Sequence, residues 1–256
     1  MATSAAPRCE HAPRCVHGGF LAVPEVRARA DAILDALYPG VRGGQAVADA
    51  LFGAFSPGGK MPYTTYSANY ASSFNFTNMS IAAPQTYLEN GTIRETPGGR
   101  TYRYYAGGDE LWPFGWGRSY TNWSLAWAGA PPPAGGFTLT PASPSLALSV
   151  QLSNEGARAG DEVLLLFAEP QPGSFAARPP PFTPLRSLVG FARRSLAPGA
   201  AARLDFNLSA GDAFALTQGD GSRAPVDGGV FTLRVGTGPA QPQVQLAVAV
   251  RLRGWA

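Results

Sequence analysis

The amino-acid sequence predicts a mainly β protein in which a β-sandwich follows a shorter, partial α/β segment. From Leu146 onwards, apolar and polar residues alternate over short runs, as expected of strands that bury one face. The chain contains 31 glycines and 24 prolines, and charged residues make up only 14%. This balance favours turn-rich β structure over long surface helices. In residues 24–37 and 45–52, apolar residues recur instead at helical spacing.

Seven or eight short strands are expected between residues 121 and 252. Alternating apolar residues indicate strands with one buried face at 146–152, 202–208, 231–235 and 244–252. The runs "EVLLLFA" (162–168) and "LRSLVGFA" (185–192) are typical of more fully buried strands, and Thr121 to Trp127 is a first strand. Turn residues separate the strands at 154–156, 197–199, 219–221 and 227–229. So many short strands in about 130 residues indicate a sandwich of immunoglobulin or fibronectin type III style.

Two helices and a long loop are expected before the sandwich. Apolar residues at helical spacing predict a helix from Pro24 to Leu37 and a second helix from Gln45 to Phe52. Gly53 suits a left-handed cap at the end of the second helix. The run "FSPGGKMPYTTY" (55–66) is expected to turn and enter a strand. Residues 67–99 are polar, aromatic and without a period, so we expect a long surface loop there.

The positive charge of the chain does not form a nucleic-acid footprint. The formal net charge is +3, but 19 of the 20 basic residues are scattered arginines and Lys60 is the only lysine. No block of five like charges occurs, and the pair Arg193-Arg194 lies in a strand-like run, so a solvated face is the better interpretation. No apolar run reaches the roughly 18 residues that span a bilayer. We expect neither nucleic acid nor membrane as a partner.

Signals for the cellular compartment point in two directions. Residues 1–22, expected to be an irregular leader, lack the apolar core of a secretory signal. Five triplets nevertheless match the N-glycosylation acceptor pattern, where about one or two would arise by chance. They begin at Asn75, Asn78, Asn90, Asn122 and Asn207. The triplets favour an extracellular or vacuolar protein, and the two observations agree if the true start lies upstream.

All cysteines and histidines of the chain lie in the leader, as Cys9, His11, Cys15 and His17. Their order suggests a zinc site, but the spacing differs from that of well-established tetrahedral sites and the surroundings are broken by proline. A solvent-exposed leader or a wrongly assigned first exon is the favoured interpretation, with a disulfide as a further alternative. We expect no metal ion and no cofactor.

None of the known catalytic or nucleotide-binding motifs that we considered is present in full in this sequence. No G-x-S-x-G occurs, and without a histidine after the leader a Ser-His-Asp or Cys-His site is excluded. "GAFSPGGK" resembles a phosphate loop, but five residues instead of four separate its glycines and a methionine follows Lys60. The glycines of "GWGRSY" and "VGTGPA" do not complete G-x-G-x-x-G either. The carboxylate pairs Asp31/Asp35 and Asp109-Glu110 are explained by surface solvation.

Longer segments resemble glycoside hydrolase family 3. "ADAILDALYPGVRGGQAVADALFGAFSPGGKMPYTTY" (30–66) is similar to the end of the α/β-sandwich domain of that family. "GGRTYRYYAGGDELWPFGWGRSYT" (98–121) resembles the segment that leaves this domain, most closely in the β-xylosidase-like branch. "GDEVLLLFA", "LVGFARRSLAPG", "ARLDFNL" and "GGVFTLRVGTG" resemble the family's fibronectin type III-like domain. Trp116 and Arg118 depart from the family pattern, which puts a polar role at that point in doubt.

The resemblance implies three parts: a leader (1–22), the end of the α/β domain with a long loop (23–118), and a fibronectin type III-like sandwich (119–256). Family members are retaining β-glycosidases whose nucleophile, an aspartate, lies in an N-terminal (β/α)8 barrel, and the usual acid/base glutamate precedes the matching region. A barrel takes about 250 residues. No catalytic residue is therefore carried over, and we expect the chain to need the barrel domain as a partner and to be inactive alone. The alternative is a stand-alone module that binds polysaccharide or a protein.

Eight rings near the end of the α/β segment pose a further choice. We expect them to pack between the two domains, because large rings bury much area at such junctions; stacking on a sugar is the alternative. They are Tyr102, Tyr104, Tyr105, Trp112, Phe114, Trp116, Tyr120 and Trp123. The fragment interpretation also predicts that Ile33, Leu34, Leu51 and Phe52 are less buried than Val150, Leu165, Phe206 and Leu233.

Overall fold

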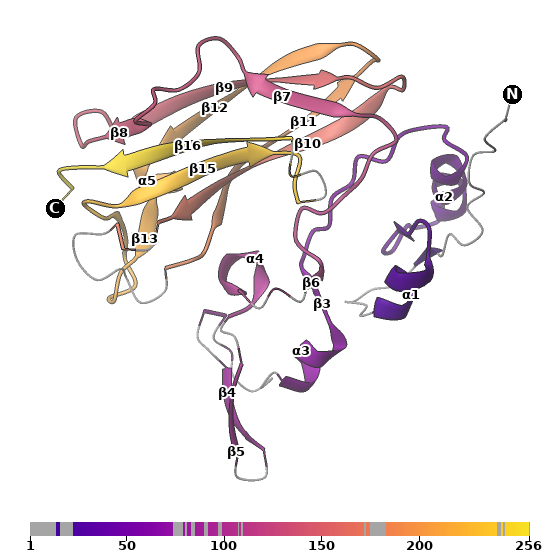
Figure 1. Ribbon diagram of the computed structural model, residues 1–256, viewed down its shortest axis with the longest axis horizontal. Coiled ribbons are helices and arrows are strands. Elements are labelled where there is room, and N and C mark those ends of the chain that lie inside the picture. The colour runs from indigo at the N-terminus through magenta and orange to yellow at the C-terminus, as the bar shows by residue number, and fades with distance from the viewer. Residues whose placement is uncertain are drawn as a thin grey trace, which may run out of the picture.

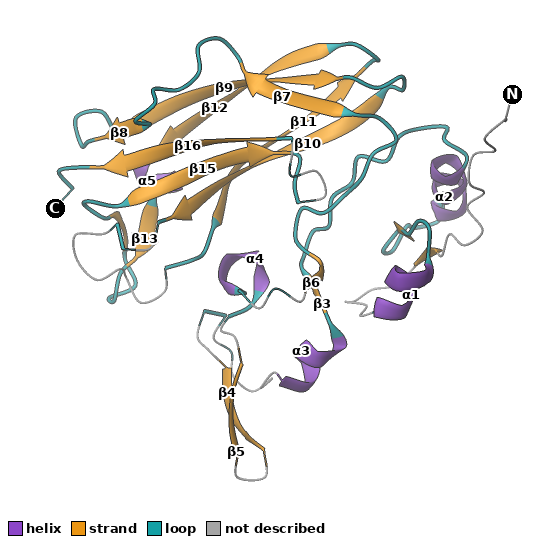
Figure 2. Cartoon of the chain, viewed as in Figure 1, coloured by secondary structure: helices purple, strands orange, loops and turns teal. Residues whose placement is uncertain are grey.

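The computed structural model shows a two-layered β-sandwich with a smaller, looser α/β segment beside it (Figures 1 and 2). The structure describes residues 14–15, 23–73, 79, 81–82, 85–89, 92–96, 99–106, 108, 110–171, 173–174, 183–239, 242 and 244–255. Helices α1 and α2 lie to one side of the sandwich, and the β4–β5 hairpin projects away from it (Figure 1).

The sandwich consists of a five-stranded sheet, in the order β11-β10-β15-β16-β8, and a three-stranded sheet, in the order β12-β9-β7. All pairs are antiparallel except β16 with β8. The strands are β7 Trp123–Trp127, β8 Phe137–Leu139, β9 Ser145–Asn154, β10 Gly160–Pro170, β11 Ser187–Leu196, β12 Ala201–Ser209, β15 Val230–Gly236 and β16 Gln245–Leu252. The prediction of a mainly β, sandwich-type fold is confirmed. β8 was not expected, since three residues are too few for a visible alternation.

The core of the sandwich follows the two-residue period of its strands. In β9, Leu148, Val150 and Leu152 are buried while the residues between them face outward. The same alternation places Leu204, Phe206 and Leu208 of β12 against them from the neighbouring strand. These side chains interdigitate with those of the other sheet in one apolar cluster, which is the main source of stability for this domain.

Strand β10 differs because it is buried on both faces. Leu164, Leu166 and Ala168 belong to the sandwich core. Leu165 and Phe167 are also buried but point to the other side of the sheet. The pairing of β10 with β11 is interrupted by a bulge between Leu166 and Phe167. The outer face of the five-stranded sheet is therefore covered by something other than the second sheet.

A short helix and a hairpin complete the sandwich. Helix α5 (Ala210–Ala213) follows β12 directly, and the Ser209 hydroxyl caps it by accepting the N–H of Asp212. Strands β13 (Ala215–Thr217) and β14 (Arg223–Pro225) then form an antiparallel pair. None of these three elements was expected, because each is only three or four residues long.

The α/β segment contains short elements. They are β1 Arg14–Cys15, α1 Pro24–Arg29, β2 Leu34–Asp35, α2 Gly43–Leu51, β3 Thr65–Tyr66, α3 Ala68–Ser73, β4 Gln85–Glu89, β5 Thr92–Thr96, α4 Thr101–Tyr104 and β6 Glu110–Trp112. β1 pairs with β2 in parallel, and β3 with β6 in antiparallel orientation. The second predicted helix and the φ of +75° at Gly53 after it agree with expectation.

Two expectations for this segment were wrong. The helix predicted from Pro24 to Leu37 ends at Arg29, because α1 buries no residue and a short helix without a packed face is marginal. Leu37 has a left-handed φ of 47°, and its N–H donates to the Asp35 carboxylate at 3.0 Å.

The segment expected to be a long surface loop, residues 67–99, contains α3 and the β4–β5 hairpin. The sequence held a signal for this hairpin, since "QTYLE" and "TIRET" flank Asn90-Gly91, a dipeptide typical of tight hairpins.

The expected difference in burial is confirmed. Leu51 and Phe52 are exposed, and Ile33 and Leu34 are half-buried. In contrast, the four chosen residues of the sandwich, Val150, Leu165, Phe206 and Leu233, are all buried.

Candidate functional site

The candidate site is the junction at which the α/β segment meets strand β10. Two stretches of backbone run side by side there: the N–H of Met61 donates to the carbonyl of Trp116 at 2.7 Å, and the N–H of Gly115 donates to the carbonyl of Met61 at 2.9 Å. The adjoining strands β3 and β6 extend this pairing. These backbone hydrogen bonds join residues about 55 positions apart in sequence and hold the α/β side of the junction together.

Glycine is required where these backbones touch. A Cβ on Gly117 would lie 2.4 Å from the carbonyl oxygen of Gly59, and one on Gly58 would lie 2.5 Å from that of Asp161. Both distances are shorter than any tolerated contact. The stretches "SPGGK" and "GWG", which resemble nucleotide-binding loops in composition, are therefore close-packed: Gly59 lies against Gly117 within the α/β segment, and Gly58 lies against Asp161 of the sandwich.

Lys60 and Glu162 form an ion pair across the junction. Lys60 Nζ lies 2.6 Å from Glu162 Oε1, and the two side chains are only 8% and 1% exposed. The same oxygen accepts the backbone N–H of Val163 at 2.8 Å. Burial raises the pKa of the Glu162 carboxyl, and the charge of Lys60 opposes this rise. The only lysine of the chain thus compensates a carboxylate that is almost completely removed from water.

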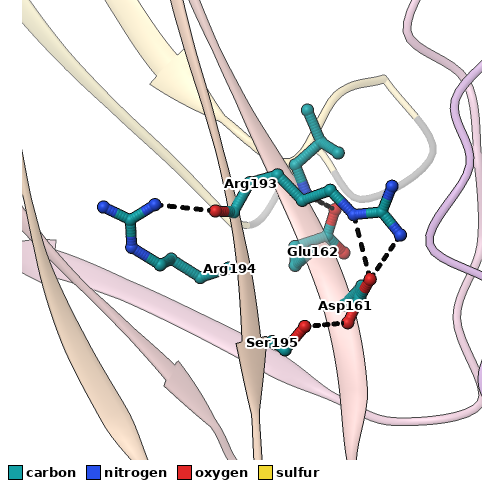
Figure 3. A network of polar contacts seen from close by, with 6 residues as sticks. Asp161, Glu162, Arg193, Arg194 and Ser195 are labelled. Atoms are coloured by element: carbon teal, nitrogen blue, oxygen red, sulfur yellow. Dashed lines mark hydrogen bonds and ion pairs between the residues drawn. The ribbon is translucent and has the colours of Figure 1, made fainter.

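The neighbouring Asp161 belongs to a separate, exposed network (Figure 3). Arg193 and Ser195 of β11 are both directed at its carboxylate, with Arg193 Nε at 2.9 Å, whereas Arg194 turns away and donates to the carbonyl of Arg193. Hydrogen bonds from Ser195 and Arg193 lower the pKa of Asp161. Adjacent residues of one strand point to opposite faces, which explains why these two carboxylates have different surroundings.

This arrangement joins domains and does not resemble a pair of catalytic carboxylates. Retaining glycosidases place two carboxyl groups about 5 to 5.5 Å apart around a space that holds the sugar. Here Glu162 is paired and buried, and Asp161 is held by Arg193 and Ser195. Two depressions in the described part of the molecule, of about 270 and 280 Å³, have no carboxylate in their walls; both include Trp127 and Pro131–Pro133.

The other candidate side chains are dispersed. Asp31 and Asp35 are exposed, Glu110 lies half-buried in β6, and Asp109 is outside the described residues. Cys9, His11 and His17 are also outside them, as is the side chain of Cys15. Among the described side chains, no group of three His, Cys, Asp or Glu could hold a metal ion.

Of the eight rings, three connect the two domains. Tyr102 stacks on Phe114 with ring centres 4.4 Å apart, and both meet Phe167 of β10 edge-on, at 5.7 and 6.2 Å. The hydroxyl of Tyr120 donates to the carbonyl of Ala50 in α2 at 3.0 Å. The contacts of Tyr102 and Phe114 with Phe167 cover the outer face of β10, and all three rings agree with the packing interpretation.

The remaining five rings have other surroundings. Tyr105 is buried within the α/β segment, edge-on to Tyr66 and Tyr70. Trp123 belongs to the sandwich core. Three are half-buried: Tyr104, Trp112 and Trp116.

The Lys60–Glu162 pair was missed by sequence reasoning. Its signal was available, because Lys60 is the only lysine of the chain and Glu162 opens the most apolar strand. The partner of each could not be identified, since the two residues are about 100 positions apart.

The fold and this junction define a class of protein: a fibronectin type III-like sandwich fixed to the end of an α/β domain. Comparison with known families agrees with this. Residues 14–120 match the glycosyl hydrolase family 3 C-terminal domain, and residues 162–238 match the fibronectin type III-like domain. The chain belongs to glycoside hydrolase family 3 and corresponds to its C-terminal portion.

Individual relatives are β-xylosidases. A probable exo-1,4-beta-xylosidase of Aspergillus fumigatus is 32% identical over 225 residues, which cover 83% of this chain and 27% of the relative. Beta-D-xylosidase 1 of Arabidopsis thaliana is 33% identical over 165 residues, covering 56% of this chain and 20% of that protein. The chain thus spans about a quarter of the length of these relatives.

Solved structures share the fold. A family 3 exo-beta-xylosidase in complex with a xylobiose aziridine probe superposes with a TM-score of 0.73 at 24% identity, covering 96% of this chain and 31% of that structure. A beta-glucosidase of Listeria innocua in complex with glucose gives a TM-score of 0.70 at 22% identity, with the same coverage. Across the described residues, no helix has the length and apolar character needed to cross a membrane.

Proposed function

We propose that this chain is the C-terminal part of a retaining β-glycosidase of β-xylosidase or β-glucosidase type, which hydrolyses O-glycosyl bonds of carbohydrates. The observation that carries the proposal is the match, in order, of both C-terminal family domains, together with about 32% identity to β-xylosidases over 83% of the chain. The junction supports it, because the α/β segment and the sandwich are packed as one unit.

In this proposal the catalytic carboxylates come from a barrel domain that acts as the partner of this chain. The chain by itself is inactive. Support comes from the carboxylates of the junction, since Glu162 is shielded from solvent and Asp161 is engaged with Arg193 and Ser195. A mechanism with two opposed carboxyl groups would need other residues.

We further propose an extracellular or vacuolar location for the full-length form. The support is the five N-glycosylation triplets. Asn122 and Asn207 are exposed, and the other three asparagines lie outside the described residues.

The test is hydrolysis of an aryl β-xyloside and an aryl β-glucoside by the purified 256-residue chain. We expect no turnover above the uncatalysed rate. The same chain joined to the front part of a family 3 β-xylosidase is expected to release the aryl group. Turnover by the isolated chain would show that its own residues catalyse the reaction, and an inactive but folded fusion would count against a glycosidase role.

A second candidate function is that of a stand-alone module binding polysaccharide or a protein. The observation in its favour is the pair of shallow depressions that share Trp127 and Pro131–Pro133, because an aromatic ring can stack on a sugar face. This function predicts that the purified chain migrates more slowly in gels that contain xylan, and that substitution of Trp127 abolishes this retardation. It also predicts that the chain does not hydrolyse xylan.

A further inference from the structure

Large apolar side chains are exposed around helix α2, in numbers found nowhere else in the described chain. Ten exposed large apolar residues occur among the described ones, and five of them fall between residues 38 and 55. We call these five the α2 surface: Tyr38, Val41, Leu51, Phe52 and Phe55, exposed by 79, 105, 39, 90 and 48%. Single exposed apolar residues are ordinary, but a concentration of them marks a contact site.

The C-terminal end of helix α2 is fixed to the rest of the molecule. Ala50 is buried, and its carbonyl accepts the hydroxyl of Tyr120 at 3.0 Å. The carbonyl of Gly53, directly after the helix, accepts Arg158 of the sandwich at 3.1 Å. These contacts fix the C-terminal end of α2, the part of the chain in which Leu51, Phe52 and Phe55 are exposed.

The partner of this surface must itself be apolar. Between residues 38 and 55 only Arg42 and Asp49 are charged, and the Asp49 carboxylate already accepts the amide of Gln45 at 2.6 Å. A charged ligand or a polar polysaccharide would gain little here, whereas an apolar protein face would remove the five side chains from water.

The lengths of the related β-xylosidases indicate which polypeptide could supply an apolar face that covers the α2 surface. This chain covers 27% of the length of the Aspergillus fumigatus β-xylosidase and 31% of the solved exo-beta-xylosidase. More than two thirds of each relative is thus additional polypeptide, and the matching family model describes a C-terminal domain. Helix α1 likewise buries no residue among those described.

We propose that the α2 surface is the docking surface for the upstream part of a longer family 3 chain, and that Phe52 is its central contact. The inference rests on the proposed function and adds the residues through which the catalytic part is held. A phenylalanine side chain buries a large apolar area at a contact, so its loss should weaken the contact at least tenfold.

The experiment measures binding of the 256-residue chain to a front piece, namely the Emericella nidulans exo-1,4-beta-xylosidase without the 27% that aligns with this chain. The removed piece serves as the positive control. We expect the wild-type chain to bind, Phe52→Ser to raise the dissociation constant at least tenfold, and Phe191→Ser to leave it unchanged. Phe191 is a matched control, because it is 72% exposed on edge strand β11.

Equal affinities of wild type and Phe52→Ser, or equal weakening by Phe191→Ser, would overturn the proposal. So would self-association of the chain through Phe52 that excludes the front piece. If the front piece does not rebind the removed piece, a second measurement is used: the fluorescence of a dye that binds exposed apolar surface, with the isolated 256-residue chain. Phe52→Ser should reduce this fluorescence severalfold more than Phe191→Ser does. Equal fluorescence of the two variants would contradict the proposal. Binding without hydrolysis of an aryl β-xyloside would support the docking surface and contradict the proposed function.

Discussion

At the scale of single residues, the Lys60–Glu162 pair is the contact with the largest expected effect. Lys60→Met leaves Glu162 charged and almost fully buried without a counter-charge, so we expect a loss of about 3 to 5 kcal/mol in the free energy of unfolding, measured by urea titration. Arg193→Met is the matched control on an exposed pair and should cost less than about 1 kcal/mol. The double variant Lys60→Met/Glu162→Leu should recover most of the loss; equal effects of the two single variants would contradict this account.

The pH dependence of the Lys60→Met variant follows from the direction of the Glu162 pKa. Burial places the pKa of folded Glu162 above its ordinary value of 4.5, so this group binds protons more readily in the folded state. Stability is therefore gained as the pH falls through the raised pKa towards 4.5. We expect the deficit of Lys60→Met, measured at neutral pH, to shrink over that range.

Two comparisons isolate Glu162 as the titrating group. The deficit of Lys60→Met/Glu162→Gln should not depend on pH in that range. Asp161 titrates elsewhere, because its pKa is lowered below 3.8 and its contribution is lost only as the pH falls through that lower value. A deficit of Lys60→Met that stays constant from pH 7 to 4.5 would show that Glu162 is not the cause.

Asn154, at the end of β9, is a second residue with a predicted large effect. Its fully buried side chain makes four hydrogen bonds, with Thr121, Gly156, Arg158 and Leu196. Asn154→Ala leaves several buried polar groups unpaired and should cost about 3 kcal/mol of unfolding free energy. Asn207→Ala, at an exposed position of β12, should change it by less than about 0.5 kcal/mol, and similar values for both would refute the assignment.

At the scale of elements, the sequence could predict the strands whose apolar residues repeat with a fixed period. It could not predict the extent of elements that depend on packing against another part of the chain. The strands of the sandwich bury one face each, so alternation identified them. The helix from Pro24 was predicted too long, because its apolar residues meet no second layer here. The ion pair at the junction could not be predicted, since nothing local relates Lys60 to Glu162 across about 100 residues. Of the acidic residues in the carboxylate pairs, Asp31 and Asp35 are exposed and Glu110 is half-buried in β6, in agreement with surface solvation for the first pair.

The two paired stretches of backbone at the junction give an element-scale prediction. Gly117→Ala puts a Cβ 2.4 Å from the carbonyl oxygen of Gly59 and must push the stretches apart, whereas Gly59→Ala meets no atom within 4 Å. We expect Gly117→Ala to lower the free energy of unfolding by more than about 2 kcal/mol, and Gly59→Ala to leave it unchanged or raise it by up to about 1 kcal/mol. Thermal unfolding of the two variants compares them directly; equal melting temperatures would contradict close packing.

At the scale of the whole molecule, the sandwich depends on the preceding segment to cover one of its faces and to pair one of its buried charges. The outer face of β10 is covered by Tyr102 and Phe114, and Glu162 is compensated by Lys60, all from the preceding segment. A sandwich domain that stands alone would be expected to cover this face of β10 and to pair Glu162 with its own residues. The sandwich is therefore completed by the preceding segment of the same chain.

The excised sandwich, residues 119–256, provides the test at this scale. It lacks Lys60 and exposes Leu165 and Phe167, so at neutral pH it should be less stable than the full chain by several kcal/mol, by the combined cost of an unpaired buried carboxylate and lost apolar burial. Glu162→Gln should stabilise the excised sandwich while destabilising the full chain, because only the full chain supplies the counter-charge. This opposite sign is the decisive result in urea titrations of the four proteins. If Glu162→Gln has the same sign in both, the preceding segment does not complete the sandwich, and the domain is autonomous.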